Sequence, residues 1–397
     1  MQRPRTVDVV VAVGFVLAVC SAGVIQTLVE LRRGQRLQAL DIFRQRPSAA
    51  KVRAYEKNLE DFSWIAQKLR PRMQYLQYVL LNDAGEKGLS GIDGWMFYKP
   101  GVEYLIAEGR ASANAIVSRD PLAAITAFRD ELALRGIRLL VIPAPNKESV
   151  YPEKLTFRAA NLGGIRSEPT SDLFERLALA GVETVDLFTE FAQAKQRQTN
   201  LPDGPLYLVQ DSHWSPAGVA VAAQAVAARL RDRGWISPGS VSYDTKLVPV
   251  QRIGDVLRML QVPEIEQTAI PESISCLQVI HPDSGRLYRD DPDSEVLVIG
   301  DSFLRIYETD EPGSAGLIAH LAKELKRPLT SLVSDGGAST LVRQELYRRP
   351  TLLKNKKVVI WEFVERDIEF GAEGWQIIPL PPAPSGTVEK SPGTKGP

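Results

Sequence analysis

A strand-forming run ends in a polar turn at Glu295-Val296-Leu297-Val298-Ile299-Gly300-Asp301-Ser302-Phe303. A short apolar run rich in β-branched residues predicts a buried strand. Gly300 then frees the backbone for a sharp turn. Because open α/β folds place their ligands at the carboxyl ends of sheet strands, Ser302 is a candidate nucleophile. The alternative is an ordinary turn in which the serine caps local backbone groups.

A second polar block lies upstream, at Gln210-Asp211-Ser212-His213-Trp214-Ser215-Pro216-Ala217-Gly218, in a chain that has only three histidines. A serine nucleophile needs a base within hydrogen-bond reach, and the base needs a group that orients it. His213 and Asp211 can supply both from one turn, so the sequence predicts a triad of Ser302, His213 and Asp211. In the alternative interpretation Asp211 forms a turn and His213 is a partly buried polar residue. The following Ser-Pro is typical of a helix start and is compatible with either interpretation.

Five short blocks occur in a fixed order along the chain: Gly94-Trp95-Met96-Phe97-Tyr98, Pro145-Asn146-Lys147-Glu148-Ser149-Val150-Tyr151-Pro152, the Asp-Ser-His-Trp block, Gly254-Asp255-Val256-Leu257-Arg258-Met259-Leu260 and the Gly-Asp-Ser-Phe block. In this order they resemble the alginate O-acetyltransferase AlgJ/AlgX family, whose members carry an SGNH-hydrolase-like domain. The resemblance spans residues 89–370. In ordinary SGNH hydrolases the serine block comes first, whereas here the acid and base precede the serine, as in the acetyltransferases.

The resemblance implies an O-acetyltransferase that holds an acetyl group on its serine and passes it to hydroxyls of an exported polysaccharide, alginate-like or another exopolysaccharide. It implies a membrane-bound O-acyltransferase as the acetyl source and a catalytic domain in the periplasm. No cofactor and no metal site is expected. One alternative is a carbohydrate esterase or deacetylase that uses the same triad. The other is a non-catalytic, membrane-tethered glycan-binding scaffold.

Composition bounds the class of protein. The chain has 397 residues, of which 44% are hydrophobic and 24% charged, which are values typical of a globular protein. Lys and Arg number 48 and Asp and Glu 48, so charge gives no reason to expect a nucleic-acid partner. Cys20 and Cys276 have no metal-site or redox spacing, and a disulfide between them is not expected.

An apolar stretch runs from Val9 to Val29 after Arg3 and Arg5. It is long enough to cross a bilayer core of about 30 Å as a helix. Residues 1–36 are therefore predicted to be a signal anchor with a transmembrane helix over residues 9–29, which makes the chain a single-pass inner-membrane protein. Alternatives are a cleaved signal peptide, a lipoprotein signal that ends at Cys20, and a buried globular helix.

The orientation of this segment is less well defined by charge. Arg32, Arg33 and Arg36 follow the apolar stretch and outnumber the two arginines before it, which argues against a cytoplasmic N-terminus. The placement of the catalytic domain outside the cytoplasm rests on the family resemblance.

The remaining chain divides into three parts. Residues 37–88 have helical spacing and are predicted to be a helical stalk. Residues 89–378 alternate strands and helices, which predicts a doubly wound, mostly parallel sheet flanked by helices. Within this part, residues 236–294 show no clear periodicity. Residues 379–397 are rich in proline and are predicted to be a disordered tail.

Two polar residues follow the predicted strand at residues 137–142. Lys147 is predicted to hold the carboxylate of an acidic sugar or to stabilise an oxyanion, and its neighbour Asn146 lies in the same turn. A solvated loop is the alternative. Gly336 and Gly337 follow another strand, at residues 329–333, where their N–H groups could join that of Ser302 in an oxyanion hole.

Other candidates lie next to the two catalytic blocks. Arg305 and Tyr307 are candidate substrate contacts, and ordinary exposed positions are the alternative. Trp214 is a candidate for stacking on a sugar ring, although a tryptophan is more often part of the core. Glu362 and Glu365 lie near a strand end, where they could contact substrate, but a salt bridge with Arg366 is the interpretation that we favour.

Overall fold

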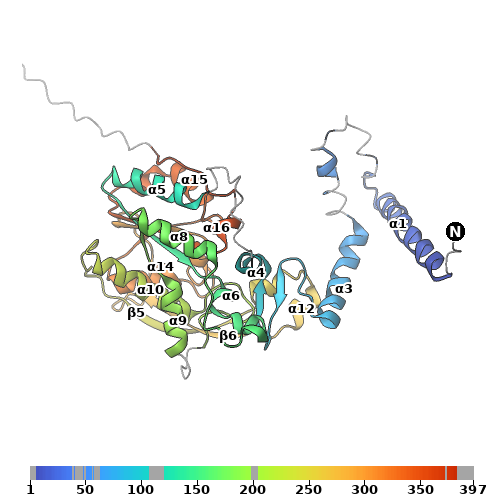
Figure 1. The fold of residues 1–397 in the computed structure, drawn as a ribbon, viewed down its shortest axis with the longest axis horizontal. Coiled ribbons are helices and arrows are strands. Elements are labelled where there is room, and N and C mark those ends of the chain that lie inside the picture. The colour runs from blue at the N-terminus through green and yellow to red at the C-terminus, as the bar shows by residue number, and fades with distance from the viewer. Residues whose placement is uncertain are drawn as a thin grey trace, which may run out of the picture. The chain divides into compact units, whose positions relative to one another are not determined.

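The computed structural model describes residues 6–37, 40, 48, 51–55, 57, 63–106, 120–197, 204–371 and 373–381 (Figure 1). The chain forms two compact units. The first comprises Met1–Gly85 with Leu260–Thr268, and the second comprises Glu86–Met259 with Ala269–Pro397. Most of the predicted tail, from residue 382 onward, lies outside the described residues.

The first unit is mainly helical in its described residues. It contains α1 (Thr6–Arg32), α3 (Trp64–Leu81) and α12 (Pro263–Thr268). The Gln26 side chain connects α1 to α3, because its Oε1 atom accepts a hydrogen bond of 2.8 Å from the Trp64 N–H. Within the described residues, no helix has both the length and the apolar character that a membrane crossing requires. The prediction of a transmembrane helix over residues 9–29 is therefore not supported.

The second unit contains a five-stranded sheet in the order β4-β3-β9-β7-β8. The strands are β3 (Arg138–Ala144), β4 (Glu183–Thr184), β7 (Val296–Gly300), β8 (Thr330–Val333) and β9 (Val358–Val364), and each neighbouring pair is parallel. All residues of β7 and β9 are buried, as expected for central strands that are covered on both faces.

Helices cover both faces of this sheet (Figure 1). One core contains residues of α9 (Leu187–Arg197), α10 (Pro216–Asp232) and α14 (Leu317–Leu325), packed on alternate sheet residues such as Val298 and Ile360. The other contains residues of α5 (Pro121–Ala133), α8 (Glu168–Leu179) and α15 (Leu341–Arg348), packed on the intervening residues such as Ile299 and Trp361. The predicted α/β fold with a parallel sheet between helices is confirmed.

Two antiparallel hairpins lie outside the main sheet. They are formed by β1 (Gly88–Ser90) with β2 (Met96–Tyr98), and by β5 (Asp244–Arg252) with β6 (Glu272–Ile280). The β5–β6 hairpin falls where the sequence shows no periodicity. Most side chains of β5 are exposed or half-buried, so the strand lacks the apolar alternation that marks a buried face.

Short helices complete the second unit. They are α4 (Lys99–Ile106), α6 (Lys147–Val150), α7 (Pro152–Leu155), η3 (Phe157–Ala159), α11 (Asp255–Arg258), α13 (Ser302–Arg305), η5 (Pro350–Leu353) and α16 (Asp367–Phe370). Three of them begin soon after a parallel strand ends: α6 after β3, α13 after β7 and α16 after β9. Because parallel strands end at the same edge, these three turns lie along one edge of the sheet.

Candidate active site

Ser302 is the first residue of α13, directly after β7 and the turn Gly300-Asp301. The Asp301 side chain caps α13 by accepting a hydrogen bond of 2.9 Å from the Phe303 N–H. A Cβ atom at Gly300 would lie 2.4 Å from Glu362 Oε2 and 2.7 Å from Leu304 Cδ1. The glycine is therefore required by the close approach of β9 and α13, and the serine is presented at the strand end by tight local packing.

The structure brings Ser302, His213 and Asp211 together from segments far apart in the sequence. His213 Nε2 lies 2.8 Å from Ser302 Oγ, and His213 Nδ1 lies 2.7 Å from Asp211 Oδ1. Since a carboxylate only accepts, Nδ1 carries the proton and Nε2 faces the serine hydroxyl with its lone pair. This arrangement can remove the hydroxyl proton. The sequence predicted the three residues, and the catalytic role of each stays a prediction.

Asp211 is fully buried and accepts hydrogen bonds from four donors. Oδ1 accepts from the His213 ring and from the His213 N–H, while Oδ2 accepts from Arg252 Nε at 3.0 Å and from the Asp255 N–H at 3.1 Å. Burial alone would raise the pKa of Asp211, but the charges and hydrogen bonds of His213 and Arg252 hold it well below its usual range. Asp211 is therefore ionised at neutral pH.

The interaction with Asp211 also changes the pKa of the His213 imidazole. Burial alone would lower the pKa of His213, but the charge and hydrogen bond of Asp211, with the charge of Asp255, raise it above the ordinary value of 6.5. The His213 ring is also 4.9 Å from the Phe303 ring, between centroids. The residue after the serine therefore packs against the imidazole.

Asp255 is a second carboxylate at the base. Its oxygens accept from the Ser212 N–H and Oγ, each at 2.6 Å, and Oδ2 lies 3.5 Å from His213 Nδ1. One nitrogen of His213 and one carboxylate oxygen each of Asp211 and Asp255 lie within 4.8 Å of one another, a spacing at which they could act as ligands of a metal ion. Every carboxylate oxygen of this group already accepts a hydrogen bond from the protein, however, which fits a network that orients the histidine.

Lys147 does not have the role predicted for it. It is only 2% exposed, and Nζ donates to the carbonyls of Met96, Val209 and Asp211 at 2.5, 2.7 and 3.1 Å. The ammonium also lies 4.8 Å from the centroid of Trp95. The prediction of a contact with a sugar carboxylate or an oxyanion is wrong, and so is the solvated loop, because all three donors are used inside the protein.

Two aromatic candidates are also buried. Trp214 is fully buried and packs edge-on against Phe303, with 5.0 Å between ring centroids. Tyr307 is fully buried, and its hydroxyl donates to the Trp214 carbonyl at 3.3 Å. Neither can contact a sugar, so both predictions are wrong and Trp214 follows the core alternative.

The remaining candidates are distributed around the strand ends. Arg305 is half-buried and forms ion pairs with Asp310 and, at 2.9 Å, with Asp335. The Gly337 N–H donates to the Ser334 carbonyl at 2.9 Å, so its predicted use in an oxyanion hole is wrong. Gly336 is exposed, and its role and that of Arg305 stay predictions.

Asn146 and Glu365 form a buried contact between the ends of β3 and β9. The Asn146 N–H donates to Glu365 Oε2 at 3.0 Å, and the same carboxylate accepts from the hydroxyls of Ser149 and Thr170. Glu365 therefore joins polar groups of the protein interior, and the expected salt bridge with Arg366 is not formed. The Asn146 Oδ1 atom instead accepts from Arg366 Nη1 at 3.5 Å.

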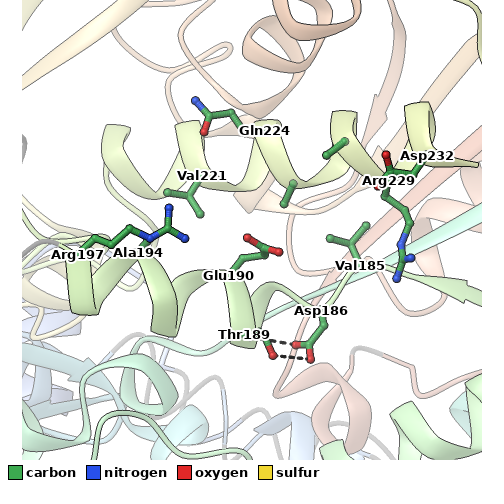
Figure 2. A pocket seen from close by; sticks show the side chains of 12 residues that line it. Val185, Asp186, Thr189, Glu190, Ala194, Arg197, Val221, Gln224, Arg229 and Asp232 are labelled. Carbon is green, nitrogen blue, oxygen red and sulfur yellow. Dashed lines mark hydrogen bonds between the residues drawn. The ribbon is translucent and has the colours of Figure 1, made fainter.

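A groove of about 490 Å³ lies elsewhere in this unit, between α9 and α10 (Figure 2). Its walls carry both signs of charge. Glu190 and Asp232 contribute negative charge, and Arg197 and Arg229 contribute positive charge. None of the triad residues lines it. It plays no part in the site at the strand ends.

Comparisons with known proteins identify the family and the fold of the chain. The family described as "SGNH hydrolase-like domain, acetyltransferase AlgX" matches residues 89–365. The probable alginate O-acetylase AlgJ of Pseudomonas aeruginosa is 24% identical over 318 residues, which cover 75% of this chain and 74% of that protein. The alginate biosynthesis protein AlgX of the same organism is 24% identical over 258 residues, which cover 60% of this chain and 49% of AlgX.

Two solved structures share the fold. The O-acetyltransferase domain of Pseudomonas putida AlgJ superposes with a TM-score of 0.56 at 22% identity, covering 71% of this chain and 92% of that domain. Pseudomonas aeruginosa AlgX superposes with a TM-score of 0.51 at 20% identity, covering 70% of this chain and 62% of AlgX. The family match extends over the whole parallel sheet and all three triad residues, and the chain belongs to the AlgX acetyltransferase family of SGNH-hydrolase-like domains.

Proposed function

We propose that this chain is a polysaccharide O-acetyltransferase in which Ser302 carries the acetyl group. The observation that supports the role of Ser302 is the hydrogen-bonded series from Asp211 through His213 to its hydroxyl, at 2.7 and 2.8 Å. The family supplies the reaction class, and relatives named alginate O-acetylase support a polysaccharide acceptor.

In the first half-reaction, Ser302 Oγ attacks the acetyl carbonyl carbon of the donor while His213 Nε2 takes the hydroxyl proton. The negative charge on the carbonyl oxygen of the tetrahedral intermediate is stabilised by N–H donors that include that of Ser302. The bond to the leaving group then breaks, and His213 gives the proton to that group. The product is acetyl-Ser302 with a neutral His213.

In the second half-reaction, a sugar hydroxyl takes the place of the leaving group. His213 removes its proton, the sugar oxygen attacks the acetyl carbon, and Ser302 Oγ leaves with the proton returned by His213. Asp211 stays ionised throughout and stabilises the imidazolium that forms in each half-reaction. Transfer competes with hydrolysis, because water could replace the sugar hydroxyl at this step.

The cellular setting is part of the proposal. We place the catalytic domain in the periplasm, beside a membrane-bound O-acyltransferase that supplies acetyl groups, with an exported polysaccharide as the acceptor. Relatives named for alginate acetylation and alginate biosynthesis support the polysaccharide acceptor in this setting. Fractionation of cells followed by protease treatment of spheroplasts tests it, since a periplasmic domain is degraded and a cytoplasmic one is protected.

The mass of the protein after exposure to an activated acetyl ester tests the chemistry. We expect one acetyl group on Ser302, none in Ser302→Ala, and loss of the label when an oligosaccharide is added, with the acetyl group recovered on the sugar. Acetate release that is independent of added oligosaccharide would identify an esterase. Unlabelled wild-type protein, or full transfer by folded Ser302→Ala, would overturn the proposal.

A further inference from the structure

Arg366 is a cation beside the triad that sequence reasoning did not assign to the site. It follows β9, which lies between β3 and β7, so it stands at the sheet edge between the turn of Asn146 and the turn of Ser302. Its guanidinium carbon lies 4.9 Å from the centroid of the Tyr98 ring and 6.0 Å from that of Phe303, the residue after Ser302. Two aromatic rings therefore hold the guanidinium next to the candidate nucleophile.

The donors of Arg366 are largely unused. A guanidinium has five N–H donors, and the one hydrogen bond that the Arg366 guanidinium makes to a described residue is the long contact of 3.5 Å with Asn146 Oδ1. In the part of the chain that the structure describes, no carboxylate lies within ion-pair distance of it. Arg252 and Arg305, by contrast, are bound to Asp211 and to two other carboxylates. Arg366 is therefore an arginine near Ser302 whose donors are not taken up by carboxylates.

The neighbouring amide has the same property. Asn146 is 1% exposed, its Oδ1 faces Arg366, and its Nδ2 is a buried donor without a hydrogen-bond partner among the described residues. A buried donor without an acceptor is costly, so such groups in native structures are often completed by a ligand or a water molecule. Asn146 is as buried as Trp214 and Tyr307, so of these two side chains only the half-buried Arg366 is open to an acceptor.

The acidic residues behind Arg366 do not neutralise it by direct contact. Burial raises the pKa of Glu148 and Asp367 to about 7 and also raises that of Asp301, while the charge of Arg366 acts against this rise in all three. Asp301 uses its carboxylate to cap α13, and Glu365 is occupied by the hydroxyls of Ser149 and Thr170. Arg366 itself is half-buried, so it is not sealed inside the protein.

We propose that Arg366 binds the carboxylate of an acidic acceptor sugar and thereby selects an anionic polysaccharide; this inference rests on the proposed function of Ser302. A planar guanidinium binds a carboxylate through two parallel hydrogen bonds, which fixes the orientation of the sugar as well as its position. A neutral sugar could not satisfy the charge.

Measuring Ser302 acetylation and transfer to the sugar separately distinguishes acceptor binding by Arg366 from direct stabilisation of the acetyl group. Arg366→Gln removes the charge and leaves a shorter polar side chain, and Arg366→Lys keeps the charge and removes the planar fork. Arg158→Gln is the control, because Arg158 is exposed and outside the site. The acceptors are an oligosaccharide of uronic acids and the same oligosaccharide with its carboxyl groups reduced to alcohols.

We expect Arg366→Gln to raise KM for the uronic acid oligosaccharide by about ten- to a hundred-fold, the range for loss of hydrogen bonds to a charged group. The rate of Ser302 acetylation by 4-nitrophenyl acetate and the kcat for transfer should change less than about twofold. The reduced oligosaccharide should show the same KM in wild type and Arg366→Gln. Arg366→Lys should be intermediate, and Arg158→Gln should match the wild type.

An acetylation step slowed as much as transfer would overturn the inference in favour of an oxyanion role. Equal KM values of the wild type for the two oligosaccharides would also overturn it. Equilibrium binding of both oligosaccharides to Ser302→Ala and to the Ser302→Ala, Arg366→Gln double variant tests Arg366 without any turnover. A wild-type chain that binds the uronic acid form through Arg366 but never becomes acetylated would refute the proposed function alone.

Discussion

Replacing Asp211 by asparagine tests the catalytic pair at its most constrained position. The carboxylate accepts from His213 Nδ1 and the His213 N–H on one oxygen, and from Arg252 Nε and the Asp255 N–H on the other. An asparagine has one accepting oxygen and one donating NH₂ group. If the oxygen faces His213, the NH₂ group meets the donors of Arg252 and Asp255. If the NH₂ group faces His213, it forces the imidazole into the tautomer whose Nε2 carries the proton and cannot remove that of Ser302.

Both orientations reduce the rate. The second has the larger effect on chemistry, and the loss known for the corresponding substitution in a serine protease triad is about 10⁴ in kcat. The pH dependence should change as well. His213 must be neutral to act as a base, and Asp211 raises the pKa of His213 above 6.5, so wild-type kcat/KM should fall as the pH drops through a value above 6.5. Without the Asp211 carboxylate, less negative charge opposes the effect of burial, so the pKa of His213 should be lower. The fall in kcat/KM should then move to lower pH.

The assay is kcat/KM for Ser302 acetylation by 4-nitrophenyl acetate over about pH 5 to 9, the range that brackets a histidine titration. Asp283→Asn is the control, because Asp283 is exposed on a surface turn. A thermal melt separates misfolding from the catalytic effect, since Arg252 also loses its partner. If folded Asp211→Asn shows the wild-type acid limb at a reduced rate, then that limb does not report the His213–Asp211 pair and the reasoning is refuted.

Three further predictions concern the framework of the site. Lys147→Met should lower the free energy of unfolding by about 3 kcal/mol or more, because three buried carbonyls lose their donor and each group left unsatisfied costs about 1–3 kcal/mol; urea denaturation measures this, and wild-type stability would contradict it. Gly254→Ala should lower the activity at least about tenfold or fail to fold, since its Cβ would lie 2.0 Å from the backbone of the loop that carries Asp211. The control Gly163→Ala, whose Cβ would meet no atom within 4 Å, should behave as wild type. Burial raises the pKa of Cys276 to about 12, so a thiol reagent at neutral pH should label exposed Cys20 in the native protein and both cysteines after denaturation; rapid native labelling of Cys276 would refute this.

The fold was predictable because its central strands are buried on both faces. The run at residues 296–299 has no polar position, and the structure places it inside the sheet between β9 and β8, where helices pack on either side. The neighbourhood of Ser302 and His213 was predictable for a related reason, because each polar block interrupts an apolar pattern next to an element end. Chemistry of this kind leaves a local signal in the sequence.

The directions of single side chains left no such signal. Lys147 and Trp214 lie in polar turns and were predicted to meet substrate, yet both point inward. The Lys147 ammonium group binds the backbone carbonyls of Met96 and Val209, which are distant in sequence. A backbone carbonyl leaves no side-chain pattern, so the sequence could not indicate this contact. Arg366 was missed for the opposite reason: a charged residue beside glutamates predicts a salt bridge, while the structure gives those glutamates other partners.

The base is held in place by elements that contain no catalytic residue. Arg252 at the end of β5 and the N–H of Asp255 at the start of α11 both donate to Asp211, while Lys147 from the turn after β3 binds the Asp211 carbonyl. The loop is therefore held at Asp211 both through the side-chain carboxylate and through the backbone carbonyl. A base on a loop that is anchored in this way does not depend on its position in the chain relative to the serine. This explains physically how the acid and base can precede Ser302 in the sequence and still meet it at 2.8 Å: the sheet edge sets the position of the nucleophile, and the β5–β6 hairpin with Lys147 sets that of the base.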